Sequence, residues 1–222
     1  MEYASSKGPE SSGKTLITKW VDYSSKYGIG AKLSNGCYVV LFNDSTKMVL
    51  HHNCFDFVYI RRESSSQKEP LDSLCTKHNF GSYPDEIKKK VILIQHFKSY
   101  LDGVKFEPPS SGTTPFERYW DIFVKKWKRA NKAILFRLSN KVIQVIFQDS
   151  SELILSSGSG DVTFITSKRE VRNTPLYQDL EKEDPSLYKR LNYAKEILVN
   201  MMNPKREGKK TEENRPMTGA TS

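Results

Sequence analysis

The feature of this sequence that most constrains its fold is an internal duplication. Residues 32–50 read KLSNGCYVVLFNDSTKMVL, and residues 137–155, which begin 105 positions later, read RLSNKVIQVIFQDSSELIL. Background composition would give roughly one or two identities over such a length, but eight positions are identical. A repeat of this kind indicates one structural unit that is present twice. In the first copy the identical residues are Leu33, Ser34, Asn35, Val40, Phe42, Asp44, Ser45 and Leu50.

Each copy alternates short runs of β-branched and aromatic residues with turn residues. In the first copy, Ser34-Asn35-Gly36 and Asn43-Asp44-Ser45 have the composition of hairpin turns. Such short connections favour antiparallel pairing over crossover helices. The predicted strands cover residues 30–33, 38–42, 47–51 and 55–61 in the first copy and residues 133–138, 143–147, 152–155 and 162–166 in the second.

A helical pattern closes each copy. Apolar residues recur at helical spacing between Pro84 and Gly103, and again between Pro185 and Pro204. One amphipathic helix is the simplest cover for the apolar face of a sheet, so the sequence predicts the α+β class with two sheet-plus-helix units. We expect a flexible N-terminal segment over residues 1–16, the first unit over 17–103, a linker over 104–116, the second unit over 117–203 and a disordered basic tail over 204–222.

The formal net charge of +9 raises a nucleic-acid hypothesis. Basic clusters lie at residues 88–90 and 125–129, and the basic residues of the tail are interrupted by acidic ones. Solvated surface is the simpler interpretation, and an acidic or phosphorylated protein partner would use the same charge. A basic nucleic-acid-binding module is therefore kept only as a remote alternative.

Nothing in the sequence points to an active site. Phosphate-cradling glycine motifs, an HExxH motif and zinc-ligand spacing are all missing. The three cysteines, Cys37, Cys54 and Cys75, have no CxxC spacing and fit reduced thiols. No apolar run approaches the ~20 residues of a membrane span, and the N-terminus lacks the core of a signal peptide. We therefore expect an intracellular, non-catalytic chain with no cofactor, no metal and no membrane contact.

Several segments are recognisable together. Lys19-Trp-Val-Asp-Tyr-Ser-Ser-Lys-Tyr-Gly-Ile-Gly30 directly precedes the first copy, and Leu41-Phe-Asn-Asp-Ser-Thr46 lies within it. With Phe97-Lys-Ser-Tyr100 and Arg190-Leu-Asn-Tyr-Ala194, these segments closely resemble the paired polo-box region of polo-like serine/threonine kinases. The resemblance covers about residues 17–202. It implies two tandem polo boxes, each a six-stranded antiparallel sheet packed with a C-terminal α-helix, and a peptide in the cleft between them.

The resemblance also implies a role. In the family this region docks the kinase on protein or peptide partners, which are often phosphorylated, at centrosomes or spindle poles, kinetochores and the division site during mitosis. It also restrains the kinase domain of the same protein. The catalytic kinase domain that precedes this region in the family is not found in this chain. We therefore expect a docking module of the cytoplasm and nucleus rather than an enzyme.

The peptide contacts of the family match this chain unevenly. Trp20, Val21 and Asp22 match a first-box motif that contacts the peptide before its phosphate. An exposed indole beside free strand backbone suits the capture of an extended peptide. Lys105 and Phe147 are further peptide-binding candidates, and Val104, Lys105 or Phe106 could replace a family leucine that packs on the peptide. The residues that match a neighbouring aromatic groove are Tyr23, Tyr27, Phe97 and Tyr100, with His96 in place of a family tyrosine.

The phosphate clamp is where the resemblance fails. The family has Asp-His-Thr-Lys, whose His and Lys clamp the phosphate, whereas this chain has Asp149-Ser-Ser-Glu152. Ser150 offers a neutral hydroxyl, and Glu152 puts a carboxylate where a phosphate of about −1.5 to −2 charges would sit. We predict weakened or lost phosphate dependence, at a cost of roughly 1–3 kcal/mol. The alternative is a phosphoserine- or phosphothreonine-peptide-binding domain whose basic pocket is built around Lys105 or Lys47.

Overall fold

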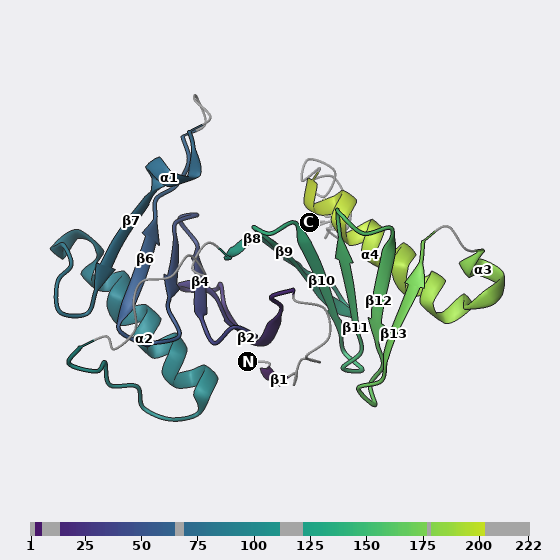
Figure 1. The fold of residues 1–222 in the computed structure, drawn as a ribbon, viewed down its shortest axis with the longest axis horizontal. Coiled ribbons are helices and arrows are strands. Elements are labelled where there is room, and N and C mark those ends of the chain that lie inside the picture. The colour runs from purple at the N-terminus through teal and green to yellow at the C-terminus, as the bar shows by residue number, and fades with distance from the viewer. Residues whose placement is uncertain (1–2, 6–13, 65–68, 112–121, 177–178, 203–222) are drawn as a thin grey trace, which may run out of the picture.

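The computed structural model describes residues 3–5 (backbone only), 14–64, 69–111, 122–176 and 179–202. Two antiparallel sheets face each other at the centre of the molecule, and one long helix lies on the outer side of each (Figure 1). The prediction of two six-stranded antiparallel sheets, each followed by a helix, is confirmed. Within these ranges no helix is both long enough and apolar enough to cross a bilayer.

The first unit has its strands in the order β1-β2-β3-β4-β5-β6-β7. Strands β2 to β7 are the six strands of the repeat, and β1 is an added strand within the range predicted to be flexible. The elements are β1 Tyr3–Ser5, β2 Ile17–Tyr23, β3 Gly28–Leu33, β4 Tyr38–Phe42, β5 Lys47–Leu50, β6 Asp56–Ile60, α1 Leu71–Leu74, β7 Cys75–Asn79, the 3-10 helix η1 Asp85–Ile87 and α2 Lys88–Asp102.

The second unit repeats this meander, with strands in the order β13-β12-β11-β10-β9-β8. Strand β8 is therefore the counterpart of β2, and each of these strands forms one edge of the repeated six-stranded sheet. The elements are β8 Val124–Arg129, β9 Ala133–Leu138, β10 Val142–Phe147, β11 Glu152–Ser156, β12 Asp161–Ile165, β13 Val171–Pro175, α3 Leu180–Glu183 and α4 Pro185–Met202.

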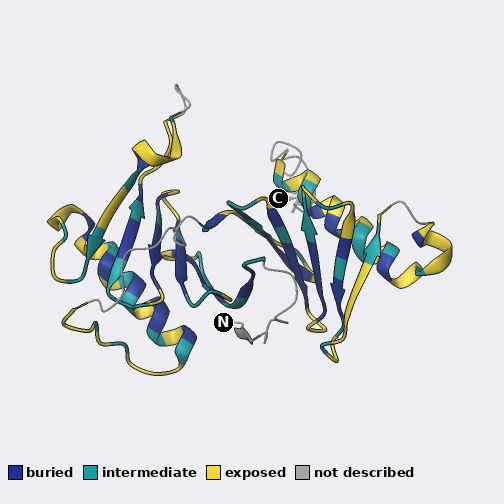
Figure 2. Ribbon diagram, in the orientation of Figure 1, coloured by how far each residue is buried: buried dark blue, intermediate teal, exposed yellow. Residues whose placement is uncertain are grey.

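Three apolar clusters hold these layers together. Because successive residues of a strand point to opposite faces, Val39 of β4 faces the second sheet and Val40 faces α2. Figure 2 shows buried residues along the facing strands and exposed residues on the turns and the outer helix surfaces. One cluster lies between the sheets, one between the first sheet and α2, and one between the second sheet and α4. Each large aliphatic or aromatic side chain buried in them contributes ~1.5–3 kcal/mol.

The turns before β5 and β11 show how closely the two units repeat each other. Ser45 and Ser150 both have left-handed backbone, with φ of 68° and 65°. In each turn the N–H of this serine donates to a phenylalanine carbonyl, at 2.9 Å in the first unit and 3.0 Å in the second. The duplication therefore reaches down to single backbone hydrogen bonds.

The same two turns are tied to the helices by equivalent ion pairs. Asp44 lies 2.5 Å from Lys90 of α2, and Asp149 lies 2.6 Å from Arg190 of α4. Burial alone would raise the pKa of both carboxyl groups. Hydrogen bonds from the basic residue and from the neighbouring Thr or Ser hold the pKa values below the usual range. The positions directly after these turns, Lys47 and Glu152, are where the two units differ most.

Candidate peptide-docking site

Strand β2 forms an edge of the first six-stranded sheet and crosses the second sheet. Tyr23 accepts a hydrogen bond from the N–H of Tyr27 at 2.8 Å, so its carbonyl faces β3. Since main-chain groups alternate in direction along an antiparallel strand, Trp20 and Asp22 direct theirs outward, away from β3. An edge with such unpaired groups is a template for an added strand. Here β1 takes that place, with Ala4 opposite Trp20.

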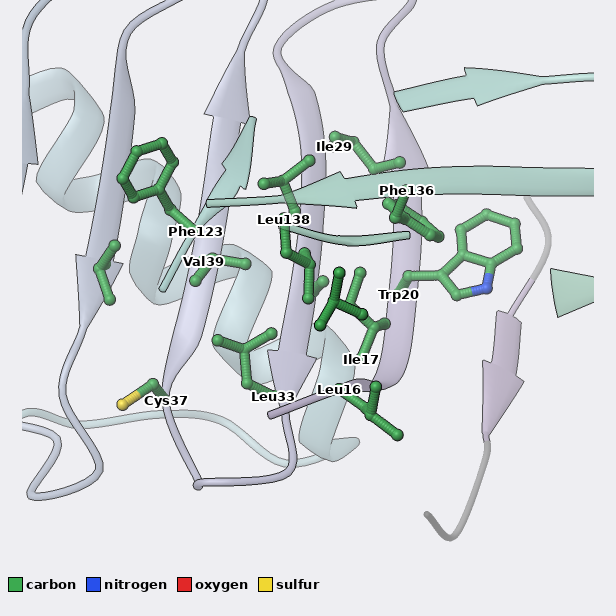
Figure 3. Close-up of a cluster of buried hydrophobic side chains, with 14 of the residues drawn as sticks. Leu16, Ile17, Trp20, Ile29, Leu33, Cys37, Val39, Phe123, Phe136 and Leu138 are labelled. Atoms are coloured by element: carbon green, nitrogen blue, oxygen red, sulfur yellow. The ribbon is translucent and has the colours of Figure 1, made fainter. Parts of the chain in front are cut away.

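The side chain of Trp20 does not behave as predicted. Its indole is only 5% exposed, and it belongs to the cluster between the two sheets. It lies beside Phe136 of β9, with 6.1 Å between the ring centroids (Figure 3). The prediction of an exposed indole is wrong because β2 lies across the second sheet, which covers this face. The ring of Trp20 is thus a core side chain, and only its main chain faces the outer edge of β2.

The neighbours of Trp20 point in alternate directions. Val21 is fully buried in the cluster beneath α2. Asp22 accepts a hydrogen bond from the N–H of Ser24 at 2.9 Å and lies 3.5 Å from the guanidinium of Arg129 on β8. Asp22 therefore joins the edges of the two repeated sheets, whereas Val21 anchors β2 to its own helix.

The structure brings all four predicted aromatic residues together in one groove of about 720 Å³ beside β2. The ring of Tyr23 lies 6.2 Å from the rings of both Phe97 and Tyr100, in edge-on contacts, and 6.5 Å from that of Tyr27. A Cβ on Gly30 would lie 2.4 Å from the ring of Phe97, so only glycine at this position lets α2 sit so close to β3. The groove is an apolar surface continuous with β2 through Val21.

Lys105 lines this aromatic groove and not the region of Ser150. Its ammonium group pairs with Glu107 at 2.9 Å, and both side chains are well exposed. Val104 also lines the groove, whereas Phe106 packs against the cluster beneath α2. In this arrangement Lys105 therefore lies beside the aromatic groove and is paired with Glu107.

Glu152, at a clamp position of the resemblance, has a different setting from the one expected. Its side chain is 2% exposed and pairs with Arg169 at 2.7 Å. Its other carboxylate oxygen accepts a hydrogen bond from the amide of Gln144 at 2.8 Å. The negative charge is thus compensated within the second unit, while Ser150 lies exposed on the turn. This compensation by Arg169 was not predicted from the sequence.

Gln144 connects this ion pair to the docking edge. The side chain is fully buried. Its oxygen accepts from the N–H of Ile17 at 2.8 Å, and its amide donates to the carbonyl of Ile17 at 2.9 Å. The start of β2 is therefore held on β10 and β11 by a buried polar network of the kind that fixes one arrangement of two sheets.

Phe147 is not brought to the docking edge. It lies on the helix side of the second sheet, in the cluster with α4, and the guanidinium of Arg190 sits 4.9 Å above its ring. Lys47 is also elsewhere, in a separate groove beside β8. Among the predicted site residues, Trp20, Val21, Asp22 and the four aromatic residues surround the same stretch of β2, whereas Lys47 and Phe147 do not.

Comparison with known proteins places this arrangement in a family. The model of the "POLO box duplicated region" matches residues 25–91 and 130–191, which together make up more than half of the chain. The chain belongs to the polo-box family. The first polo box contains strands β2 to β7 with α2, and the second contains β8 to β13 with α4.

Curated relatives are serine/threonine-protein kinases, and this chain spans only about a third of their length or less. The chain is 41% identical over 165 residues to the probable serine/threonine-protein kinase CCRP1 of Zea mays, covering 74% of the chain and 26% of that protein. It is 33% identical over 197 residues to the serine/threonine-protein kinase PLK1 of Xenopus laevis, covering 85% of the chain and 31% of that protein. The chain thus matches only the polo-box part of these relatives.

Solved structures show the same fold. The crystal structure of the polo-box domain of Cdc5 from budding yeast superposes with a TM-score of 0.66 at 24% identity, covering 88% of this chain and 80% of that chain. The Cdc5 polo-box domain in complex with an Spc72 phosphopeptide gives a TM-score of 0.67 at 24% identity, covering 88% and 72%. At 24% identity, this similarity shows that the chain shares the fold of these paired polo boxes.

Two residues of the second polo box that matter for the site escaped the sequence prediction. Gln144 carried a usable signal, because it interrupts the apolar run Val142-Ile-Gln-Val-Ile-Phe147, where a polar residue must find a partner if buried. Arg169 carried none. It lies in the turn between β12 and β13 with φ of 68°, and only the folded chain brings it to Glu152.

Proposed function

We propose that this chain is the non-catalytic docking module of a polo-like kinase and binds extended segments of partner proteins along the outer edge of β2. The observation that carries the proposal is the pairing of β1 on this edge, with Tyr3 opposite Val21 and Ser5 opposite Lys19. It is supported by the Cdc5 polo-box domain, which has been solved in complexes with an Spc72 phosphopeptide and with the Dbf4 polo-interacting region.

In this proposal the main chain supplies affinity and the neighbouring side chains supply selectivity. Strand addition forms hydrogen bonds to Trp20 and Asp22, and alternate side chains of the ligand fall on opposite faces. The side chains on one face of the bound peptide contact the aromatic groove around Tyr23 and Tyr100. The chain would thereby bring a kinase to partners at mitotic structures, or hold the kinase domain of the same protein.

We further propose that phosphate adds little to binding at this edge. Ser150 carries no charge, and the charge of Arg169 is already matched by Glu152 at 2.7 Å. Drawing Arg169 toward a phosphate would leave Glu152 buried without its cation, which costs several kcal/mol. The two lysines that could have replaced the clamp lie in other grooves, Lys105 beside α2 and Lys47 beside β8.

The test is a calorimetric titration of the chain with matched peptides that carry Ser-Thr or Ser-phosphoThr. We expect dissociation constants within about threefold of each other, which corresponds to less than ~1 kcal/mol. A preference of tenfold or more for the phosphopeptide would contradict the phosphate-independent proposal and make the Glu152–Arg169 pair the place to look for its cause.

The site itself is tested separately by amide hydrogen exchange of the peptide-bound chain. The outward-facing amide of Asp22, which lies beyond the residues paired with β1, should gain protection, because strand addition gives it an acceptor. The inward-facing amide of Val21 serves as the matched control, since it already pairs with β3 in the free chain. Unchanged exchange at Asp22 under saturating peptide would place the docking site elsewhere.

A further inference from the structure

Two residues that line the aromatic groove of the first polo box are replaced in the second box. One of them is Tyr27, whose carbonyl accepts a hydrogen bond from the N–H of Asn43 at 3.0 Å. In the second box the N–H of Gln148 donates to the carbonyl of Lys132 at 3.0 Å. Lys132 is therefore the counterpart of Tyr27, and a lysine takes the position of a tyrosine.

The second replacement lies on the helices. Lys90 of α2 and Arg190 of α4 occupy equivalent positions, because each pairs with the aspartate of the turn in its own box. Three residues later α2 has Leu93, which lines the aromatic groove, whereas α4 has Tyr193. The hydroxyl of Tyr193 accepts a hydrogen bond from the N–H of Lys132 at 3.2 Å, so the two replacements meet in the folded chain. Because the hydroxyl is the acceptor in this bond, its own proton remains available to a ligand.

Lys132 and Tyr193 line a groove of about 500 Å³ on the second polo box. It lies between the end of β10 and α4, the helix on the outer side of the second sheet (Figure 1). The ring of Phe147, which is 7% exposed, supplies the buried apolar part of its wall, and Lys132 and Lys189 are exposed. The other lining residues are Gln148, Asp149 and Arg190. A groove of this size suits one large side chain and its flanking main chain.

The positive charge of this groove is only partly compensated. Arg190 pairs with Asp149 at 2.6 Å, and its guanidinium carbon lies 4.9 Å from the centroid of the Phe147 ring. Within the described residues, neither Lys132 nor Lys189 forms an ion pair. Three basic side chains and one acidic side chain thus line the groove, so two positive charges remain in excess beside an apolar wall.

We propose that this groove is a second docking site, and that its ligand is an aromatic side chain of a partner protein flanked by Asp and Glu residues. The ligand ring packs against Phe147 and Tyr193, since aromatic pairs stabilise each other beyond the apolar area that they bury. The flanking carboxylates lie beside Lys132 and Lys189, where they form charge-assisted contacts. The site lies on the second polo box and does not depend on binding at the β2 edge.

The composition of the groove disfavours simpler ligands. An aromatic segment without acids would cover Phe147 but would take Lys132 and Lys189 out of water without a partner, which is unfavourable. A run of acids alone would pair with the lysines and leave the apolar wall uncovered. A single-stranded nucleic acid supplies both rings and negative charges, so the test compares it directly with a peptide.

The probe is a fluorescent peptide with one phenylalanine between two aspartates and two glutamates, titrated with the full chain by anisotropy. One matched peptide has alanine in place of phenylalanine, and another has asparagine and glutamine in place of the acids. We expect each matched peptide to bind at least about tenfold more weakly at low salt, because each lacks one of the two contributions. Equal binding of the alanine peptide, or no saturable binding of the probe, would overturn the proposal.

Charge reversal at the two exposed lysines tests where the probe binds. Lys132→Glu with Lys189→Glu should weaken its binding by at least about tenfold. The control, Lys88→Glu with Lys89→Glu, makes the same charge change on the exposed surface of α2 and should alter binding less than about twofold. Lys89 is the first-box counterpart of Lys189, so an equal loss in the control would overturn the proposal. All four side chains are exposed, so both variants are expected to fold.

Tyr193→Leu, which installs the residue of the first box, tests the ring contact. It should weaken binding of the phenylalanine peptide by about fivefold and alter that of the alanine peptide less than about twofold, a difference that a general loss of structure would not produce. On titration, the backbone amide resonances of Lys132 and Gln148 should shift, and those of their counterparts Tyr27 and Asn43 should not. Shifts confined to Tyr27 and Asn43, an equal effect of Tyr193→Leu on both peptides, or tighter binding of single-stranded RNA than of the probe would each overturn the proposal.

Discussion

Lys47 and Glu152 occupy the same position in the two polo boxes, as the first residues of β5 and β11, and they carry opposite charges. The turns before them have the same hydrogen bonds and the same ion pair to the helix. Glu152 is buried and compensated by Arg169, whereas Lys47 lines a groove to which Arg62, Lys125, Lys126 and Lys128 also contribute among the described residues. The duplicated turns have thus kept the same backbone, while the residues that follow them carry opposite charges in different surroundings.

The two boxes also differ eight residues before Lys47 and Glu152, where one box has an apolar residue and the other a polar one. The second box has Gln144, whose amide binds the main chain of β2 and the carboxylate of Glu152. The first box has Val39, which packs in the apolar cluster between the sheets. One side of the inter-box contact is therefore fixed by directional polar bonds and the other by apolar packing.

The largest effect is expected from charge reversal at the buried position. Glu152→Lys places a cation beside Arg169 and removes the partner of a buried charge, so the free energy of unfolding should fall by ~3–5 kcal/mol. Urea denaturation measures this. The equivalent change in the first box, Lys47→Glu, should cost less than ~1 kcal/mol because that side chain is half-exposed. Equal losses in the two boxes would refute the asymmetry.

Adding Arg169→Glu to Glu152→Lys should recover part of the loss, because the pair is then restored with its polarity reversed. For the same reason, building the clamp of the family with Ser150→His and Glu152→Lys requires a change at Arg169 as well. If Glu152→Lys with Arg169→Glu recovers none of the lost stability, the pair depends on having glutamate at position 152 and arginine at position 169.

A smaller effect is expected when Gln144 is replaced by valine, the residue that the first box has at the equivalent position, Val39. Gln144→Val removes the two hydrogen bonds to the main chain of Ile17 and the one to Glu152, which should lower the free energy of unfolding by ~1–3 kcal/mol. Gln148→Val removes a glutamine whose amide donates to Asn131 in an exposed setting, and should cost less than ~1 kcal/mol. A neutral Gln144→Val would show that packing alone holds β2 on the second sheet.

The smallest effect concerns a carboxylate of the first box, Asp102 at the end of α2. Burial alone would raise its pKa, but hydrogen bonds from Lys98, Tyr38 and Lys32 lower it to about 2. Since the pKa in the folded chain lies below that in the unfolded chain, this stabilisation is present above pH ~4 and is lost as the pH falls toward ~2. After allowance for solvent screening it amounts to ~1–2 kcal/mol.

Urea midpoints measured across this pH range check the prediction, with Asp102→Asn as the variant. Asp102→Asn should be less stable at neutral pH and should lose less stability on acidification than the unchanged chain. Parallel curves for the two proteins would show that other carboxyl groups cause the acid sensitivity.

The sequence was sufficient to predict the repeated units, most of their inner strands and both long helices, because each has a clear hydrophobic period. The edge strands β2 and β8 were not predicted from residue pattern, and neither were β7 and β13. Strands β7 and β13 contain sequences such as Cys75-Thr-Lys-His-Asn79 that are largely polar and mostly exposed or half-buried, and only pairing with a neighbour makes them strands. For the site, the four residues that the resemblance assigns to an aromatic groove do line one groove beside β2. The resemblance could not predict that Trp20 is buried or that Arg169 neutralises Glu152, because both depend on contacts between distant segments.

The strand β1 makes binding at the β2 edge an exchange rather than a simple addition. A segment tethered to the edge by a short stretch of the same chain competes at a local concentration of ~mM. A free partner binds only the fraction of molecules whose edge is vacant, so its apparent affinity is its intrinsic affinity reduced by that fraction. Any event that keeps residues 3–5 away from β2 would then strengthen partner binding without altering a single contact in the docking site.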